Sequence, residues 1–167
     1  MKTDSALWAA IRSIAKQWQS RQEDIRSFAE TKYSFEEWLN WEAFCACKSQ
    51  HLKVTPKPTY PRSQKQADLR IELDGKKFIW IEIALVHDGT IKRKWLEKLK
   101  HDQQKLRRIK PQQDHLIQLI VVACRNEANL TWWQEKGFPR LKQQIEVLPP
   151  LRIWPTKPQG SILAWKI

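Results

Sequence analysis

The chain has 167 residues, enough for one domain with a substantial core but short for two domains that would each be stable alone. Hydrophobic residues make up 41% and charged residues 29%, with only four glycines, so the composition is globular rather than disordered or fibrous. The sequence contains no run of about 20 apolar residues, which excludes a membrane-spanning helix.

The formal net charge of +12 favours a polyanionic partner. Nucleic acid is the leading candidate, and membrane-surface binding or simple solubility are the alternatives. Between positions 92 and 110, nine lysines and arginines stand against one glutamate and one aspartate. Most of the ten tryptophans should lie in the core, while an exposed minority would be able to stack on nucleotide bases.

Three cysteines are too few for a disulfide framework, and the N-terminal segment lacks an apolar stretch of the kind used for secretion, so we expect a cytoplasmic protein. Cys45, Cys47 and His51 suggest a zinc site at first sight. We disfavour it because residues two apart on a helix point in different directions, and because structural zinc normally uses two closely spaced ligand pairs.

Apolar spacing predicts a helix over about 4–28 and a second helix from Ser34 to about Lys48, which begins with a capping-box sequence. A proline-bearing extended stretch follows, with a short strand at 52–55. Residues 68–73 and 77–86 predict two antiparallel strands joined by a turn at 74–76.

Residues 91–109 predict a basic amphipathic helix, and 115–123 a strand covered on both faces. A helix broken at Gly137 and Pro139 is expected over 131–147, followed by short strands near 151–154 and 162–165. The resulting fold class is α/β, with a central mixed sheet of about four to five strands flanked by helices.

The hairpin brings two acidic residues together. If residues 74–76 form a three-residue loop, Leu73 pairs with Lys77 and Asp68 falls opposite Glu82. Adjacent carboxylates destabilise a sheet unless positive charge lies between them, and oxygen ligands of this type suit magnesium or manganese. The alternative is that Glu82 pairs with a lysine or arginine of the basic helix.

Three acidic residues resemble the motif of the PD-(D/E)xK nuclease superfamily, which has the restriction-endonuclease-like fold. Asp68 and Glu82 lie on the two expected hairpin strands, and Glu42 lies on the helix expected before them. The resemblance covers about half of the chain, from Ser34 to Ala123. It implies a single nuclease-like domain over 1–167, with an N-terminal helical part at about 1–50, a catalytic core at about 34–123 and C-terminal elements at about 131–167.

The resemblance also implies a magnesium- or manganese-dependent endonuclease that hydrolyses DNA. Asp68, Glu82, Glu42 and the main-chain carbonyl of Ile83 would hold the metal. Cleavage of double-stranded DNA would require a homodimer or a higher homo-oligomer, in a setting of restriction, homing, repair or transposition. Phosphate contacts are expected from the basic helix, through Lys92, Arg93, Lys94, Lys98, Lys105 and Arg108.

The chain departs from the motif at Ala84, where the family has a catalytic lysine. Three explanations are open: a lysine displaced to another element, with Lys92, Lys94 and Lys98 nearest; a deliberate lysine-to-alanine substitution; or a natural pseudo-nuclease. The fit of alanine to the strand pattern favours the deliberate substitution. The alternative functions are an inactive nucleic-acid-binding module of the same fold and an RNA-binding scaffold with exposed tryptophans.

Overall fold

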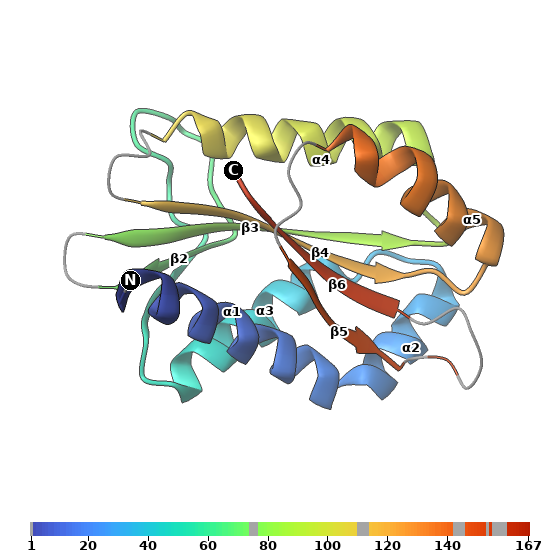
Figure 1. The fold of residues 1–167 in the computed structure, drawn as a ribbon, viewed down its shortest axis with the longest axis horizontal. Coiled ribbons are helices and arrows are strands. Elements are labelled where there is room, and N and C mark those ends of the chain that lie inside the picture. Colours follow the sequence, from blue (N-terminus) through green and yellow to red (C-terminus); the bar gives the residue numbers. More distant parts are fainter. Residues whose placement is uncertain (1, 74–76, 110–113, 142–145, 153, 155–159) are drawn as a thin grey trace.

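The structure is a computed structural model that describes residues 2–73, 77–109, 114–141, 146–152, 154 and 160–167. The described residues form three layers, with a six-stranded sheet between two layers of helices (Figure 1). The α/β class and the mixed sheet were predicted correctly. The predicted turn at 74–76 lies outside the described residues.

The sheet has the strand order β1-β2-β3-β4-β6-β5. Its neighbours are antiparallel except for β3 and β4, which are parallel and joined through a helical crossover, as parallel strands require. The sheet has six strands where about four to five were expected, because both C-terminal segments predicted as short strands pair in it, although the first lies mainly before the predicted 151–154. Their bounds are β1 (Lys53–Pro56), β2 (Leu69–Glu72), β3 (Phe78–His87), β4 (His115–Ala123), β5 (Glu146–Leu151) and β6 (Gly160–Lys166).

Three helices, α1 (Lys2–Ser20), α2 (Gln22–Thr31) and α3 (Glu36–Ser49), lie on one side of the sheet (Figure 1). The single helix expected over 4–28 is wrong, because the chain turns at Arg21. The apolar spacing continues through the break because both helices bury residues in the same core. The expected capping box is also wrong. Helix α3 begins after Phe35 without a side-chain cap, and Glu37 pairs with Lys57 instead.

The other side of the sheet is covered by α4 (Lys92–Arg107) and α5 (Glu127–Trp132) (Figure 1). Asn126 caps α5 by accepting a hydrogen bond from the Asn129 N–H at 3.1 Å, so this helix begins before the predicted 131. It continues through a π-helical turn, η1 (Trp133–Gly137), and a 3-10 turn, η2 (Phe138–Arg140). The predicted helix is wrong at 146–147, which belong to β5, and its stretch 142–145 lies outside the described residues. None of the described helices has the length and apolar character needed to cross a membrane.

Alternate residues of β3 and β4 enter two different cores, as the period of a strand requires. Ile81 and Ile83 of β3 belong to the core under α1–α3, whereas Ala84 and Val86 belong to the core under α4 and α5. Glu82 is two residues before Ala84 and therefore points to the same face of the sheet, so its carboxylate lies on the α4 side. The register of the sheet therefore places one acidic residue under the basic helix.

A pair of buried amides joins α4 to the sheet beside Glu82. Gln118, which is opposite Glu82 on β4, accepts a hydrogen bond from Gln103 Nε2 at 3.0 Å and donates one to the Leu99 carbonyl at 3.0 Å. Both glutamines are at most 3% exposed. These bonds fix the position of α4 along the sheet.

The single substitution Gln118→Leu should lower the free energy of unfolding by about 1–3 kcal/mol, because it leaves the Gln103 amide buried without its partner. The double variant Gln103→Leu/Gln118→Leu should recover part of this loss, since both polar groups are then removed together. Urea unfolding of the four proteins of this cycle measures both effects. Strictly additive losses would contradict the pairing.

Candidate functional site

Asp68 lies immediately before β2, where this strand separates from β3. Its N–H donates to the Ile81 carbonyl at 3.1 Å, while its Oδ2 accepts a hydrogen bond from the Ile83 N–H at 2.7 Å. The side chain therefore occupies the place where the next strand residue would pair. Its other oxygen, Oδ1, accepts hydrogen bonds from Asn40 at 3.0 Å and Lys57 at 2.9 Å.

The predicted register of the hairpin is confirmed as far as Leu69, which lies opposite Ile81, and the Leu73 N–H donates to the Lys77 carbonyl at 2.8 Å. The expected pairing of Asp68 with Glu82 does not continue this register, because the Asp68 N–H bonds to the Ile81 carbonyl. The Asp68 side chain bonds to Asn40 of α3, whereas Glu82 contacts Lys105 of α4. The negative charge of Asp68 contributes to raising the pKa of Glu82, as expected for neighbouring carboxylates.

Glu82 is a carboxylate buried in the middle of the sheet, with 3% of its surface exposed. Its Oε1 accepts a short hydrogen bond from the Tyr60 hydroxyl and lies 2.8 Å from Nζ of Lys105. Burial, followed by the charges of Asp68 and Asp102, raises the pKa of Glu82 to about 7, although Lys105 and Tyr60 act in the opposite direction. The contact with Lys105 is the ion pair with the basic helix that the sequence offered as the alternative for Glu82.

A row of charges on α4 continues from Lys105. Residues 98, 102 and 105 lie on one face of the helix, because their spacings are three and four. Asp102 is 2.8 Å from Lys105 and 4.0 Å from Lys98. Lys98 in turn donates to both oxygens of Glu36 at the start of α3, at 2.6 and 2.7 Å. Burial raises the pKa of Glu36, while Lys98 lowers it.

Ion pairs join these groups into two sets, which together we call the acid–lysine cluster. One set holds Glu36, Glu82 and Asp102 with Lys98 and Lys105, and the other holds Glu37 and Asp68 with Lys57. Five carboxylates thus stand against three ammonium groups in the cluster, if every group is ionised. Burial is the largest cause of the raised pKa of Glu82, and the charges of Asp68 and Asp102 add to it.

Ala84 is fully buried and packs in the core that contains Leu96 and Leu99 of α4. Two lysines of α4, Lys98 and Lys105, instead bring ammonium groups to the cluster. Of these, Lys98 was among the expected candidates for a displaced lysine, whereas Lys105 was expected only to contact phosphate.

Glu42 lies apart from Asp68 and Glu82. It accepts a hydrogen bond from Gln17 at 2.6 Å and lies 3.8 Å from the Arg21 guanidinium. Glu42 follows Asn40 by two residues, so it points to the opposite side of α3 from the residue that contacts Asp68. The expectation that Glu42 supplies the helical carboxylate is therefore not met, and Glu36 lies in the cluster in its place.

Within the described residues, no three histidine, cysteine, aspartate or glutamate side chains are grouped closely enough to hold a metal ion. Magnesium is nevertheless often bound by one or two carboxylates that water and substrate phosphates supplement. Asp68 and Glu82 fit this pattern. The Ile83 carbonyl points to the same side as its N–H, toward Asp68. Carboxylate and carbonyl oxygens are the donor types that suit magnesium.

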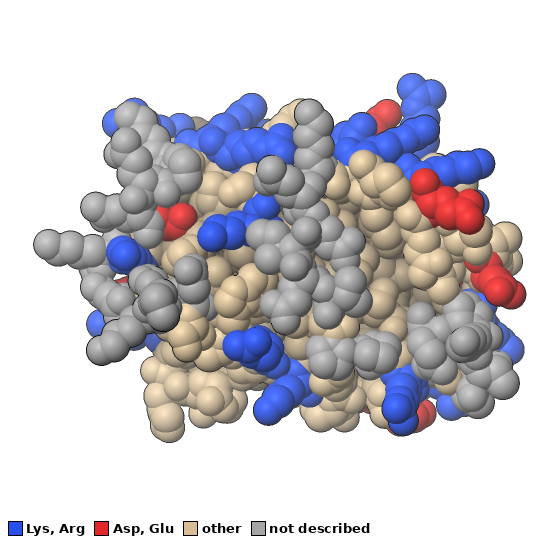
Figure 2. All heavy atoms as spheres, in the orientation of Figure 1, with Lys and Arg blue, Asp and Glu red and all other residues tan. Residues whose placement is uncertain are grey.

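The remaining cations of α4 are mostly exposed. Figure 2 shows lysine and arginine side chains along the edge of the molecule over α4. Within the part of the chain that the structure describes, Arg93 pairs with its helix neighbour Glu97 at 3.3 Å, and Lys92 lies over the ring of Trp132 at 5.4 Å. Lys94 and Arg108 are exposed. The predicted phosphate contacts thus divide into an outer set and the two lysines of the cluster.

Four groups at the site were not predicted from the sequence, namely Glu36, Lys57, Tyr60 and Asp102. Tyr60 and Lys57 lie in the proline-bearing stretch, where no periodic pattern indicates the direction of a side chain. The spacing of Asp102 and Lys105 was a usable signal, since it predicts an ion pair on one face of α4. Cys45 is exposed while Cys47 is buried, so the two thiols point apart as expected.

Compared with known proteins, the sequence matches no protein-family model, and neither a curated protein nor a solved structure matches it significantly. The chemistry of the site is therefore inferred from the geometry of its residues.

The raised pKa of Glu82 predicts how stability depends on pH. The folded protein holds this proton more tightly than the unfolded chain, so the stabilising contribution is present below pH 4.5 and is lost as pH rises through about 7. Glu82→Gln should abolish this part of the dependence, which amounts to at most a few kcal/mol because one pKa unit corresponds to about 1.4 kcal/mol.

Chemical unfolding across this pH range measures the difference between wild type and Glu82→Gln, with the exposed Glu135→Gln as the matched control. Lys105→Met should raise the pKa of Glu82 further and move the loss of stability to higher pH. Equal slopes for wild type and Glu82→Gln would contradict the assignment.

Proposed function

We propose that the protein is a magnesium-dependent nuclease that hydrolyses phosphodiester bonds in DNA. The observation that carries the proposal is the contact of 2.8 Å between Lys105 and Glu82, a carboxylate whose pKa the nearby charge of Asp68 helps to raise. Two acids and a lysine are thereby grouped as in the PD-(D/E)xK motif, but the lysine comes from α4 instead of position 84.

The order of the elements supports a restriction-endonuclease-like fold for the proposed nuclease. Helix α3 is followed by the antiparallel strands β1–β3, the crossover helix α4 and the parallel strand β4. This is the succession that the resemblance implies for residues 34–123. The fold alone does not define an activity, so the proposal depends on the site.

Asp68, Glu82 and the Ile83 carbonyl would hold the magnesium ion. When bound, magnesium polarises a phosphate and lowers the pKa of a coordinated water. Lys105 would then neutralise the charge that develops on the phosphate oxygens. The hydroxyl of Tyr60 orients the Glu82 carboxylate, and the exposed cations of α4 would hold the strand through phosphate contacts that carry no sequence information.

The proposed role of Lys105 predicts the outcome of a plasmid-cleavage assay. Wild type should nick or linearise supercoiled DNA in magnesium, and Glu82→Gln and Lys105→Met should each lose at least about 100-fold in rate, as the removal of a preorganised charged group does. Lys100→Met is the matched control, because Lys100 is an exposed lysine of the same helix. Thermal melts of each variant verify that it is folded.

The variant Ala84→Lys distinguishes a catalytic role of Lys105 from the alternative that the active enzyme needs a lysine at position 84. If Ala84→Lys cleaves DNA and the wild type does not, the catalytic lysine belongs at position 84, which would contradict the role of Lys105. Because Ala84 is fully buried, this variant needs the same test of folding.

The second candidate is an inactive nucleic-acid-binding module of the same fold. The observation that favours it is that Lys57 and Lys105 already pair with the two carboxylates. DNA binding without cleavage by either wild type or Ala84→Lys would support it. An RNA-binding scaffold is less well supported, since Trp41, at 61% exposed, is the one tryptophan of the described residues that is largely open to solvent.

A nuclease of this kind would act on cytoplasmic DNA, and cleavage of both strands would require two copies of the site. Sedimentation with duplex DNA would measure the number of copies bound.

A further inference from the structure

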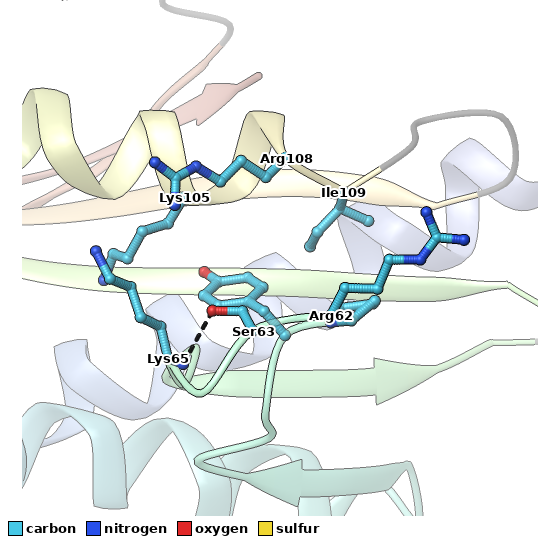
Figure 3. A pocket seen from close by; sticks show the side chains of 8 residues that line it. Arg62, Ser63, Lys65, Lys105, Arg108 and Ile109 are labelled. Carbon is cyan, nitrogen blue, oxygen red and sulfur yellow. Dashed lines mark hydrogen bonds between the residues drawn. The ribbon is translucent and has the colours of Figure 1, made fainter.

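A basic pocket opens beside the acid–lysine cluster, between α4 and the loop that connects β1 to β2. Its volume is about 220 Å³. Figure 3 shows side chains entering it from two elements, with Lys105 and Arg108 on α4 and Arg62, Ser63 and Lys65 on the loop. Tyr60, Pro61 and Ile109 complete the lining.

The lining contains four cations and no acidic residue. Lys105 has partners in Asp102 and Glu82, whereas no carboxylate of the described residues pairs with Arg62, Lys65 or Arg108. Lys65 lies 3.2 Å from a ring nitrogen of His101. Figure 3 shows the charged ends of Lys65, Lys105 and Arg108 on one side of the pocket and the guanidinium of Arg62 on the other. Like charges around one cavity repel one another, and a bound anion would relieve this repulsion.

The main chain of the loop holds these cations in place. Tyr60 N–H donates to the Lys65 carbonyl at 2.9 Å, Ser63 N–H donates to the Tyr60 carbonyl at 3.2 Å, and Thr59 bridges to Gln66 at the base. Arg62 has a φ of 59°, an uncommon conformation for a residue with a side chain. These main-chain bonds fix the backbone from which the Arg62 and Lys65 side chains extend to line the pocket.

The pocket and the cluster share two side chains. The Tyr60 ring lines the pocket while its hydroxyl donates to Glu82, and Lys105 lines the pocket while its ammonium group contacts the same carboxylate. An anion in the pocket would therefore lie next to the proposed catalytic acids.

We propose that this pocket binds the terminal phosphate of a nucleic-acid strand, so that strands with a phosphorylated end are the preferred substrates. The proposal rests on the proposed function in taking nucleic acid as the ligand. A phosphate monoester carries a charge of about −1.5 to −2 at pH 7 and three strong acceptor oxygens, whereas each backbone phosphate carries one charge. Arginine forks pair with such oxygens in bidentate fashion. The apolar surfaces of Pro61 and Ile109 would contact the terminal nucleoside.

The test is a binding measurement without metal, so that no strand is cut. Fluorescence anisotropy compares one labelled oligonucleotide with a 5′-phosphate, a 3′-phosphate or hydroxyl ends, and inorganic phosphate serves as a competitor. One phosphorylated form should bind at least about 10-fold more tightly than the hydroxyl form, which corresponds to about 1.4 kcal/mol. The form preferred identifies which end enters the pocket.

Arg62→Gln/Arg108→Gln should remove this preference. Arg93→Gln/Arg107→Gln should keep it, because it removes the same charge from exposed positions of α4 outside the pocket. Lys65→Gln provides an independent variant should the first double variant fail to fold. Equal binding of phosphorylated and hydroxyl ends by wild type, or a preference that survives in the folded pocket variants, would overturn the proposal.

This outcome is independent of the plasmid assay. End-selective binding with no cleavage would support the pocket and refute the nuclease. Plasmid cleavage with no preference for phosphorylated ends would do the reverse.

Discussion

The ion pair between Glu82 and Lys105 is the interaction on which the arrangement of the site depends. A carboxylate at 3% exposure in the middle of a sheet is costly unless charge and hydrogen bonds compensate it. The compensation comes from a helix and a loop that are distant in sequence, through Lys105 and Tyr60. The position of Glu82 on β3 thereby constrains both α4 and the loop between β1 and β2.

Helix α4 consequently has three different surfaces. One buries Leu96, Leu99 and Leu106 against the sheet, and a second carries the charges of the cluster. The third carries exposed cations toward solvent (Figure 2). This division explains how a strongly basic chain remains compact. Its inner lysines are neutralised by buried carboxylates, and its outer cations are spread along a surface where water and salt screen their repulsion.

The sequence predicted the parts of the fold in which a pattern of apolar residues is read directly. Strand β4 has the predicted bounds, and the register between Leu69 and Ile81 follows from the alternation of the hairpin. The position of α4 was also predicted closely, because its buried stripe repeats with the helical period. These predictions depend on local geometry and on burial alone.

The rest depended on packing between distant segments. Both Glu36 and Glu42 lie on the predicted α3, but the side of that helix that meets Asp68 is fixed by how α3 packs on the sheet. Tyr60 reaches Glu82 across 22 positions of sequence, from a segment without a periodic pattern. The break at Arg21 was hidden because the helices on either side face one core.

Under the proposed function, Asp68 and Glu82 hold a cation, and without metal Lys57 pairs with Asp68 and Lys105 with Glu82. Crystals grown with manganese and a phosphorylated oligonucleotide test it most directly, through the anomalous scattering of the metal. The account predicts a manganese peak bound by oxygens of both carboxylates, with Lys57 displaced from Asp68. Well-ordered carboxylates that keep their lysine partners, with no peak between them, would contradict it.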